Sequence, residues 1–126
     1  MDRWQALYSF WSRFGLDAYE ESSVPEQAGF PRLTYESNVS SFNEPVSLSA
    51  SIWYKDPDEH DKNWRPVDQK ADEISSFIGM GGIMEIYDGG ALWIKRGSPF
   101  AQRMSDPDTS VRRVVLQIEA EFLSEN

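Results

Sequence analysis

The sequence contains no cysteine and only one histidine, which removes several kinds of chemistry at the outset. Without cysteine there is no disulfide framework, no thiol nucleophile and none of the common zinc sites. The single histidine, His60, lies in an acidic run at residues 56–61. That run lacks the glycine at position six and the glutamate at position twelve that a calcium-binding loop requires. We therefore interpret it as a solvated loop before a helix and predict no metal site.

Basic residues are scarce, and long apolar runs are absent. Twelve Lys and Arg face 21 Asp and Glu, which gives a net charge of −9. This balance argues against non-specific binding to nucleic acid or anionic membranes, because both require clustered cations. No run approaches the length of a bilayer span, and the first residues lack the order of a signal peptide. We expect a soluble protein made in the cytoplasm, with no membrane partner and no sequence-specific nucleic-acid binding.

The sequence also lacks a phosphate-binding loop. The glycine-rich residues 79–82 do not continue into Gly-Lys-Ser/Thr and follow a predicted helix rather than a strand, so they indicate a flexible link. Acid–base catalysis would depend on carboxylates such as Glu85, Asp88 or Glu119, and nothing in their spacing singles out a pair. We therefore predict a protein that is not an enzyme and that carries no cofactor.

Two long stretches alternate between apolar and polar residues, as half-buried strands do. The first is residues 46–54 and the second is residues 111–123. A shorter strand is predicted at residues 32–36, after a loop at residues 17–31, and a polar link at residues 37–45 joins it to the first long strand. Residues 83–87 and 91–95 flank Asp88, Gly89 and Gly90, which is the turn chemistry of a β-hairpin. Residues 97–110 are expected to form a long link.

Two helices are predicted. The first begins at a cap, Asp2, and ends at Gly15, and its aromatic stripe either covers the sheet or packs in part against a neighbouring subunit. The second covers residues 64–78, is capped by Asn63 or Asp61, and has Pro66 in its first turn. The predicted buried positions are Trp4, Leu7, Tyr8, Trp11 and Phe14 in the first helix, with Phe10 widening the stripe, and Val67, Ala71, Ile74, Phe77 and Ile78 in the second.

The 126 residues suffice for one domain with one core. The order of elements predicts an α+β fold, with a single mostly antiparallel β-sheet and two main helices packed on one face.

Charge is distributed unevenly along the chain. Residues 95–113 hold five basic and two acidic residues, a local charge of +3, so the rest of the chain carries −12. One interpretation is a solvated loop whose Phe100 packs onto the sheet. The other is a basic, partly apolar surface that meets the acidic surface of an identical neighbour. The candidate subunit or partner interface consists of Trp93, Lys95, Arg96, Phe100, Arg103, Met104, Arg112 and Arg113.

Several runs resemble proteins of long-tailed bacteriophages. Residues 30–35, read Phe-Pro-Arg-Leu-Thr-Tyr, together with the strands at 46–54 and 114–123, resemble the layout of tail terminator proteins. Residues 87–94, read Tyr-Asp-Gly-Gly-Ala-Leu-Trp-Ile, followed by residues 97–104, are similar to small neck and tail-completion proteins of phages and prophages. The similarity covers nearly the whole chain, but its runs are not a residue-specific signature, so no contact residues follow from it.

The resemblance implies a structural role in the virion, in the tail or neck, with assembly in the host cytoplasm. Tail terminators form a homohexameric ring that caps the tail tube, ends tail polymerisation and provides the surface on which the head docks. The implied partners are other copies of the chain, the tail tube protein and a head-completion or connector protein, and DNA passes through the ring. The alternatives are a head-completion or connector protein at the portal side, a small ligand-binding α+β domain, or a regulatory module that binds a partner protein.

Overall fold

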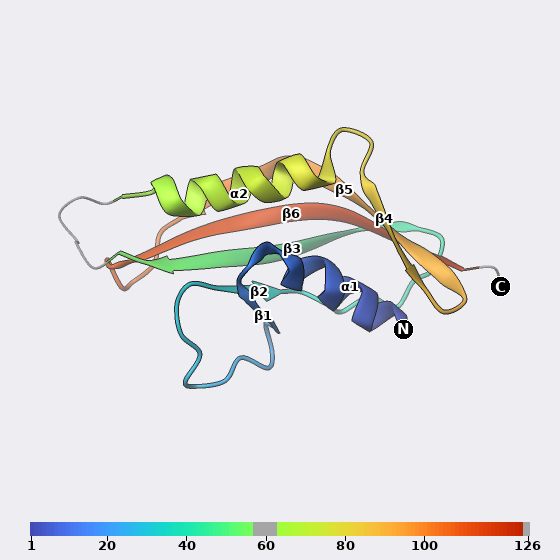
Figure 1. Ribbon diagram of the computed structural model, residues 1–126, viewed down its shortest axis with the longest axis horizontal. Helices are drawn as coiled ribbons and strands as arrows, with labels where there is room; N and C mark the ends of the chain where they lie inside the picture. Colours follow the sequence, from blue (N-terminus) through green and yellow to red (C-terminus); the bar gives the residue numbers. More distant parts are fainter. Residues whose placement is uncertain (57–62, 125–126) are drawn as a thin grey trace.

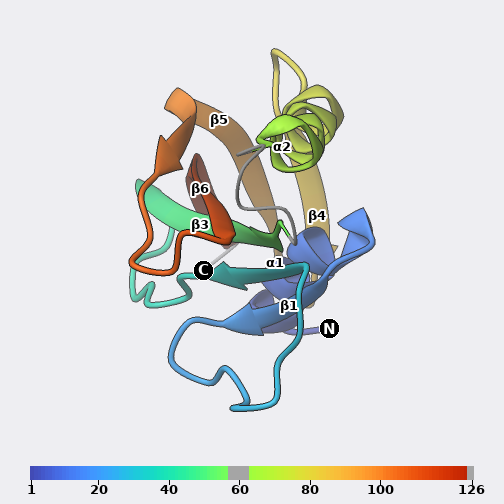
Figure 2. The same cartoon turned by 90° about the vertical axis from the view of Figure 1, so that its left-hand side faces the viewer.

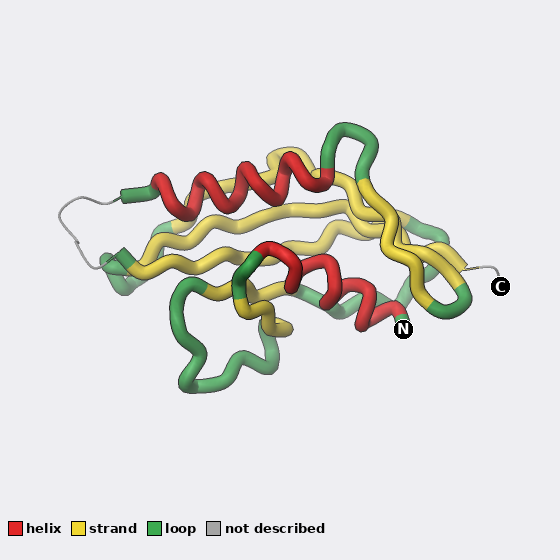
Figure 3. Tube along the Cα trace, in the orientation of Figure 1, coloured by secondary structure: helices red, strands yellow, loops and turns green. Residues whose placement is uncertain are grey.

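Six strands form one mixed β-sheet in the computed structural model, which describes residues 1–56 and 63–124 (Figures 1 and 3). The strands lie in the order β1-β2-β3-β6-β5-β4. β1 and β2 are parallel, and every other neighbouring pair is antiparallel. The predicted α+β fold with a single sheet and two helices is therefore confirmed. The elements are α1 (Arg3–Trp11), η1 (Ser12–Phe14), β1 (Asp17–Glu20), β2 (Arg32–Tyr35), β3 (Pro45–Lys55), α2 (Arg65–Ile78), β4 (Ile83–Tyr87), β5 (Gly90–Met104) and β6 (Val111–Ser124).

The two long predicted strands are confirmed as β3 and β6, and they pair with one another in the middle of the sheet. Their antiparallel register runs without interruption from Pro45 opposite Glu121 to Lys55 opposite Val111. Alternation decides which face each side chain takes. The buried face holds Leu48, Ala50 and Ile52 of β3 and Val114, Leu116, Ile118, Ala120 and Phe122 of β6.

Two segments predicted as loops contain strands. Within residues 17–31, Asp17–Glu20 forms β1, which is short, polar and paired in parallel with β2, so it carries no clear alternation. The prediction of a long link at residues 97–110 is wrong for its first half, because β5 continues to Met104. β5 keeps its pairing with β6 across a register shift between Arg96 and Ala101. At Gly97 an added Cβ would lie 2.8 Å from the Cβ atom of Gln117, so the close approach of the two strands favours glycine there.

The first helix begins as predicted and buries Leu7, Phe10, Trp11 and Phe14 of the predicted stripe. Asp2 and Gln5 form a reciprocal capping box, and Gly15 follows η1 with φ 77°. The buried residues of α1 are Ala6, Leu7, Phe10 and Trp11. The predicted stripe was therefore wrong at Trp4 and Tyr8, which are 38% and 50% exposed.

The second helix buries Val67, Ala71, Ile74 and Ile78, as predicted. Phe77 is exposed instead, although its ring lies edge-on to Phe14 with centroids 5.5 Å apart. Trp64 occupies the cap position without a side-chain hydrogen bond, while the side chain of Asn63 accepts one from the backbone N–H of Arg65, at 3.0 Å. The other predicted cap, at position 61, lies outside the described residues.

Both helices lie over the same side of the sheet, as Figures 1 and 2 show. One continuous core fills the space between the two layers, with contributions from α1, α2 and every strand of the sheet. Within residues 1–56 and 63–124 no helix covers the opposite side of the sheet, and we call that side the open face (Figure 2). No helix among the described residues is both long and apolar enough to cross a bilayer.

Candidate interface on the open face

Four of the predicted interface residues lie on the open face. Trp93 and Lys95 alternate with the buried Leu92 and Ile94 of β5, so they point to the opposite side of the sheet from the core. Arg113 likewise precedes the buried Val114 in β6, and Met104 pairs with Arg113 across the two strands. The ammonium group of Lys95 lies 4.5 Å from the centre of the Trp93 ring.

Three others lie on the helix side of β5. Arg96 donates a hydrogen bond to Ser75 Oγ of α2, at 3.0 Å. Arg103 Nη2 lies 2.6 Å from the carboxylate of Asp68, also in α2, and this hydrogen bond raises the pKa of the Arg103 guanidinium. Phe100 packs against the core, as the first interpretation of this segment predicted. Much of the positive charge of β5 is therefore used to hold α2.

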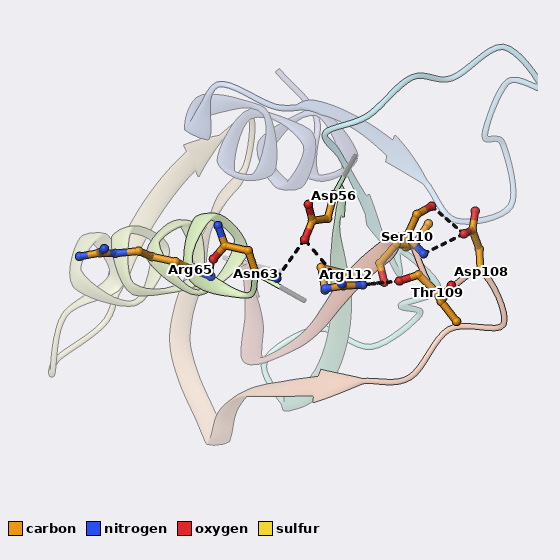
Figure 4. Close-up of polar contacts among 8 residues, drawn as sticks. Asp56, Asn63, Arg65, Asp108, Thr109, Ser110 and Arg112 are labelled. Carbon is orange, nitrogen blue, oxygen red and sulfur yellow. Dashed lines mark hydrogen bonds and ion pairs between the residues drawn. The ribbon is translucent and has the colours of Figure 1, made fainter. Parts of the chain in front are cut away.

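Arg112 does not lie on the surface, which corrects its place in the predicted interface. Only 5% of its side chain is exposed, and Figure 4 shows it between the ends of several elements. Its Nη1 atom donates to the carbonyl oxygens of Thr109 at 2.5 Å and Val111 at 3.2 Å. Its Nη2 atom lies 3.5 Å from the carboxylate of Asp56, just beyond β3. The buried guanidinium therefore connects β3 to the start of β6.

The turn before β6 is stabilised by its own polar contacts. The carboxylate of Asp108 accepts hydrogen bonds from the backbone N–H of Ser110 at 2.9 Å and from its hydroxyl at 2.6 Å (Figure 4). These bonds are the main cause that lowers the pKa of Asp108, and the charge of Lys55 adds to the effect. Hydrogen bonds to a charged acceptor are stronger than neutral ones, so these bonds stabilise the turn that precedes β6.

A second group of cations on the open face comes from strands that the charge count did not single out. Arg32 of β2, Trp53 of β3 and Arg113 of β6 are opposite one another in the register, and we call them the Arg–Trp–Arg row. The guanidinium carbons lie 5.6 Å (Arg32) and 4.5 Å (Arg113) from the centre of the Trp53 ring. Next to the row, Arg32 and Lys55 contact the exposed ring of Phe30, at 4.4 and 5.8 Å.

Sequence reasoning missed this row because its members are far apart in the chain. The alternation of β3 did hold part of the signal, because it places Trp53 and Lys55 on the same face as Ser47, Ser49 and Ser51. An aromatic residue on the polar face of a strand indicates a surface with a role in contacts. The pairing of β2, β3 and β6 that unites the row is a property of the folded sheet alone.

Large apolar side chains gather at the other end of the open face. Met84 and Ile86 of the outermost strand β4 are 52% and 70% exposed. They pair with Trp93 and Ala91 of β5, so they lie on the same face as Trp93. We call Met84, Ile86 and Trp93 the hairpin patch. Exposed apolar side chains on an edge strand commonly mark a contact with another chain.

The carboxylates considered for acid–base chemistry are not brought together. Glu85 forms an ion pair with Arg13, and Asp88 accepts from the terminal ammonium group at 2.8 Å. Glu119 is exposed on the open face of β6, opposite Lys95. No group of three or more possible metal ligands occurs in residues 1–56 and 63–124. The acidic run that was interpreted as a solvated loop lies, from residue 57 on, outside the described part.

No protein-family model matches the chain. No curated protein matches its sequence either.

Proposed function

We propose that this chain is a structural protein of a long-tailed bacteriophage virion, which forms a ring on the tail tube, ends tail polymerisation and presents the surface for head docking. The observation that carries the proposal is the open face of the sheet, which bears the hairpin patch at one end and the Arg–Trp–Arg row at the other. Such a face provides contact area without a catalytic constellation. The resemblance to tail terminators supplies the virion setting.

A ring requires a heterologous contact, in which two different surfaces of each subunit meet. The chain has surfaces of distinct chemistry to serve this purpose. The hairpin patch is apolar and includes Met and Trp, which are enriched in interface cores. The chain as a whole carries an excess of acidic residues, with a net charge of −9.

The proposed partners follow from this role. Six copies of the chain form the ring, the tail tube protein lies below it, and a head-completion or connector protein docks above it. The protein acts without a cofactor and without catalysis. DNA passes through the ring, and a net charge of −9 keeps the subunits from binding its phosphates tightly.

Imaging of mixtures with tail tubes tests the proposal. Purified protein is added to tubes of the cognate phage and examined by negative-stain microscopy, with mass photometry of the free protein alongside. We expect a six-fold ring at one end of each tube. Tubes that remain bare at both ends, together with protein bound instead to the portal side of filled heads, would favour a connector role.

A further inference from the structure

Three cations, Arg32, Lys55 and Arg113, surround the aromatic rings of Trp53 and Phe30. Arg32, Lys55 and Arg113 take part in none of the ion pairs among the described residues. Three such cations on one face, held around two aromatic rings, form a local positive surface on an acidic protein.

The row is held in place by contacts that leave donors unused. Trp53 donates its indole N–H to Thr34 Oγ1 at 3.0 Å, which fixes the ring between the strands. Arg113 donates from Nε to Ser51 Oγ at 3.1 Å, and Arg32 donates from Nη1 to the carbonyl oxygen of Ala28 at 3.0 Å. Guanidinium groups fixed against rings, with free donors, are prepared to bind carboxylates.

An acidic segment lies beside the row, at the β1 edge of the sheet. Residues 17–29 contain four acidic residues and no basic residue. Asp17, Glu21 and Glu26 are exposed, and no carboxylate of this segment forms an ion pair within the described chain. The segment comprises β1, at the edge of the sheet, and a loop that extends away from the body of the protein (Figures 1 and 2). We call it the acidic edge.

We propose that the Arg–Trp–Arg row and Lys55 of one copy bind the acidic edge of a neighbouring copy. The inference rests on the proposed function and assigns the surfaces that join subunits in the ring. The two surfaces are complementary in charge and adjoin on the subunit, since Asp17 is opposite Arg32 in the register of β1 and β2 and Arg32 donates to the carbonyl oxygen of Ala28. Neither surface takes part in an ion pair among the described residues. A contact between them is heterologous and repeats from copy to copy, as a ring requires.

Nucleic acid is the other macromolecule that a cationic, aromatic surface could bind. Single-stranded nucleic acid binds such surfaces by stacking its bases on open aromatic faces. Here guanidinium groups already lie against the rings of Phe30 and Trp53. The net charge of −9 also opposes a polyanion, so a carboxylate-bearing segment of a second copy is the better match.

Charge reversal on both sides tests the contact. The variants are Arg32→Glu with Arg113→Glu, Glu21→Lys with Glu26→Lys, and all four changes together. Arg65→Glu, which reverses an exposed cation outside the row, serves as the control. Self-association is measured by sedimentation velocity at low and high salt, and circular dichroism checks that each variant is folded.

The wild type is expected to self-associate, and added salt should weaken this association. Each two-site reversal should weaken association at least about tenfold, and the four-site variant should recover most of it, because the charges are exchanged rather than removed. Wild-type protein that stays monomeric at every concentration, folded reversals that associate as wild type does, or a four-site variant no better than the two-site ones would each overturn the inference.

Two further measurements distinguish a failure of this contact from a failure of the proposed function and from binding of nucleic acid. Rings on tube ends that survive the reversals would leave the proposed function standing while the assigned contact fails. Anisotropy of a labelled DNA oligonucleotide is measured with the same variants. DNA binding that is lost with Arg32→Glu and Arg113→Glu, while self-association is unchanged, would assign the row to nucleic acid and overturn the inference.

Discussion

Arg112 and Asp56 form a buried pair, with Nη2 of the arginine 3.5 Å from the carboxylate and side chains only 5% and 12% exposed. The pair joins the end of β3 to the start of β6. The same carboxylate also accepts a hydrogen bond, at 2.9 Å, from the backbone N–H of Asn63, which lies just before α2. Removing one member of a buried pair leaves the other charge without compensation.

Arg112→Met is therefore expected to lower the free energy of unfolding by about 3 kcal/mol, because it leaves the carboxylate of Asp56 buried. Arg112→Met with Asp56→Asn should cost less than the single change, since no buried charge remains. Urea unfolding followed by tryptophan fluorescence measures both. A double variant that is less stable than Arg112→Met alone would show that the pair has another role.

Trp11→Ala is expected to cost roughly 3–5 kcal/mol, as large-to-small changes in a core do. The side chain is fully buried and lies at 4.7 Å from Phe10, centre to centre. Trp4→Ala serves as the control within the same helix, because Trp4 is partly exposed. Equal losses in the two variants, measured by urea unfolding, would contradict the assignment of Trp11 to the core.

Tyr35 is expected to ionise last among the five tyrosines. Burial, with the charge of Glu20 as a lesser cause, raises the pKa of Tyr35 from 10.0 to about 12. Because the folded pKa is above the unfolded one, the stabilisation by neutral Tyr35 is complete below pH 10 and is lost as pH rises from about 10 to 12. Absorbance titration should show a late step that Tyr35→Phe removes. A late step that persists in Tyr35→Phe would contradict this.

The hairpin patch should matter for assembly and little for folding. Met84→Ser with Ile86→Ser is expected to reduce ring formation at least about tenfold, while unfolding changes by less than about 1 kcal/mol, since both side chains are more than half exposed. Met80→Ser, in the loop before β4 and 96% exposed, is the matched control. Rings that form normally in the double variant would remove the patch from the interface.

Regular alternation made β3 and β6 predictable, and the turn residues did the same for the hairpin of β4 and β5. The second half of β5 was missed because Gly97, Ser98 and Pro99 break the pattern at the register shift, and only the pairing with β6 restores the strand. β1 was missed because a short polar segment has no period to read. The face of α1 was misassigned at Trp4 because aromatic content outweighed position in the helix.

The candidate site was predictable only in part. Charge counting along the chain identified Arg113 but also included Arg112, which is buried, and Arg103, which binds Asp68 of α2. Arg32 and Lys55 could not be grouped with Arg113, because they are brought together by strand order rather than by position in the sequence. The local charge count therefore pointed to residues 95–113, whereas the Arg–Trp–Arg row is defined by the pairing of β2, β3 and β6.

A tube-growth assay tests the central claim most directly. Short tail tubes are incubated with free tube protein, with and without this chain, and tube lengths and ends are measured by electron microscopy. The account predicts that added chain stops growth and that a six-fold ring lies on one end of every stopped tube. Tubes that lengthen as fast with the chain as without it, and that carry no ring, would contradict the proposed function.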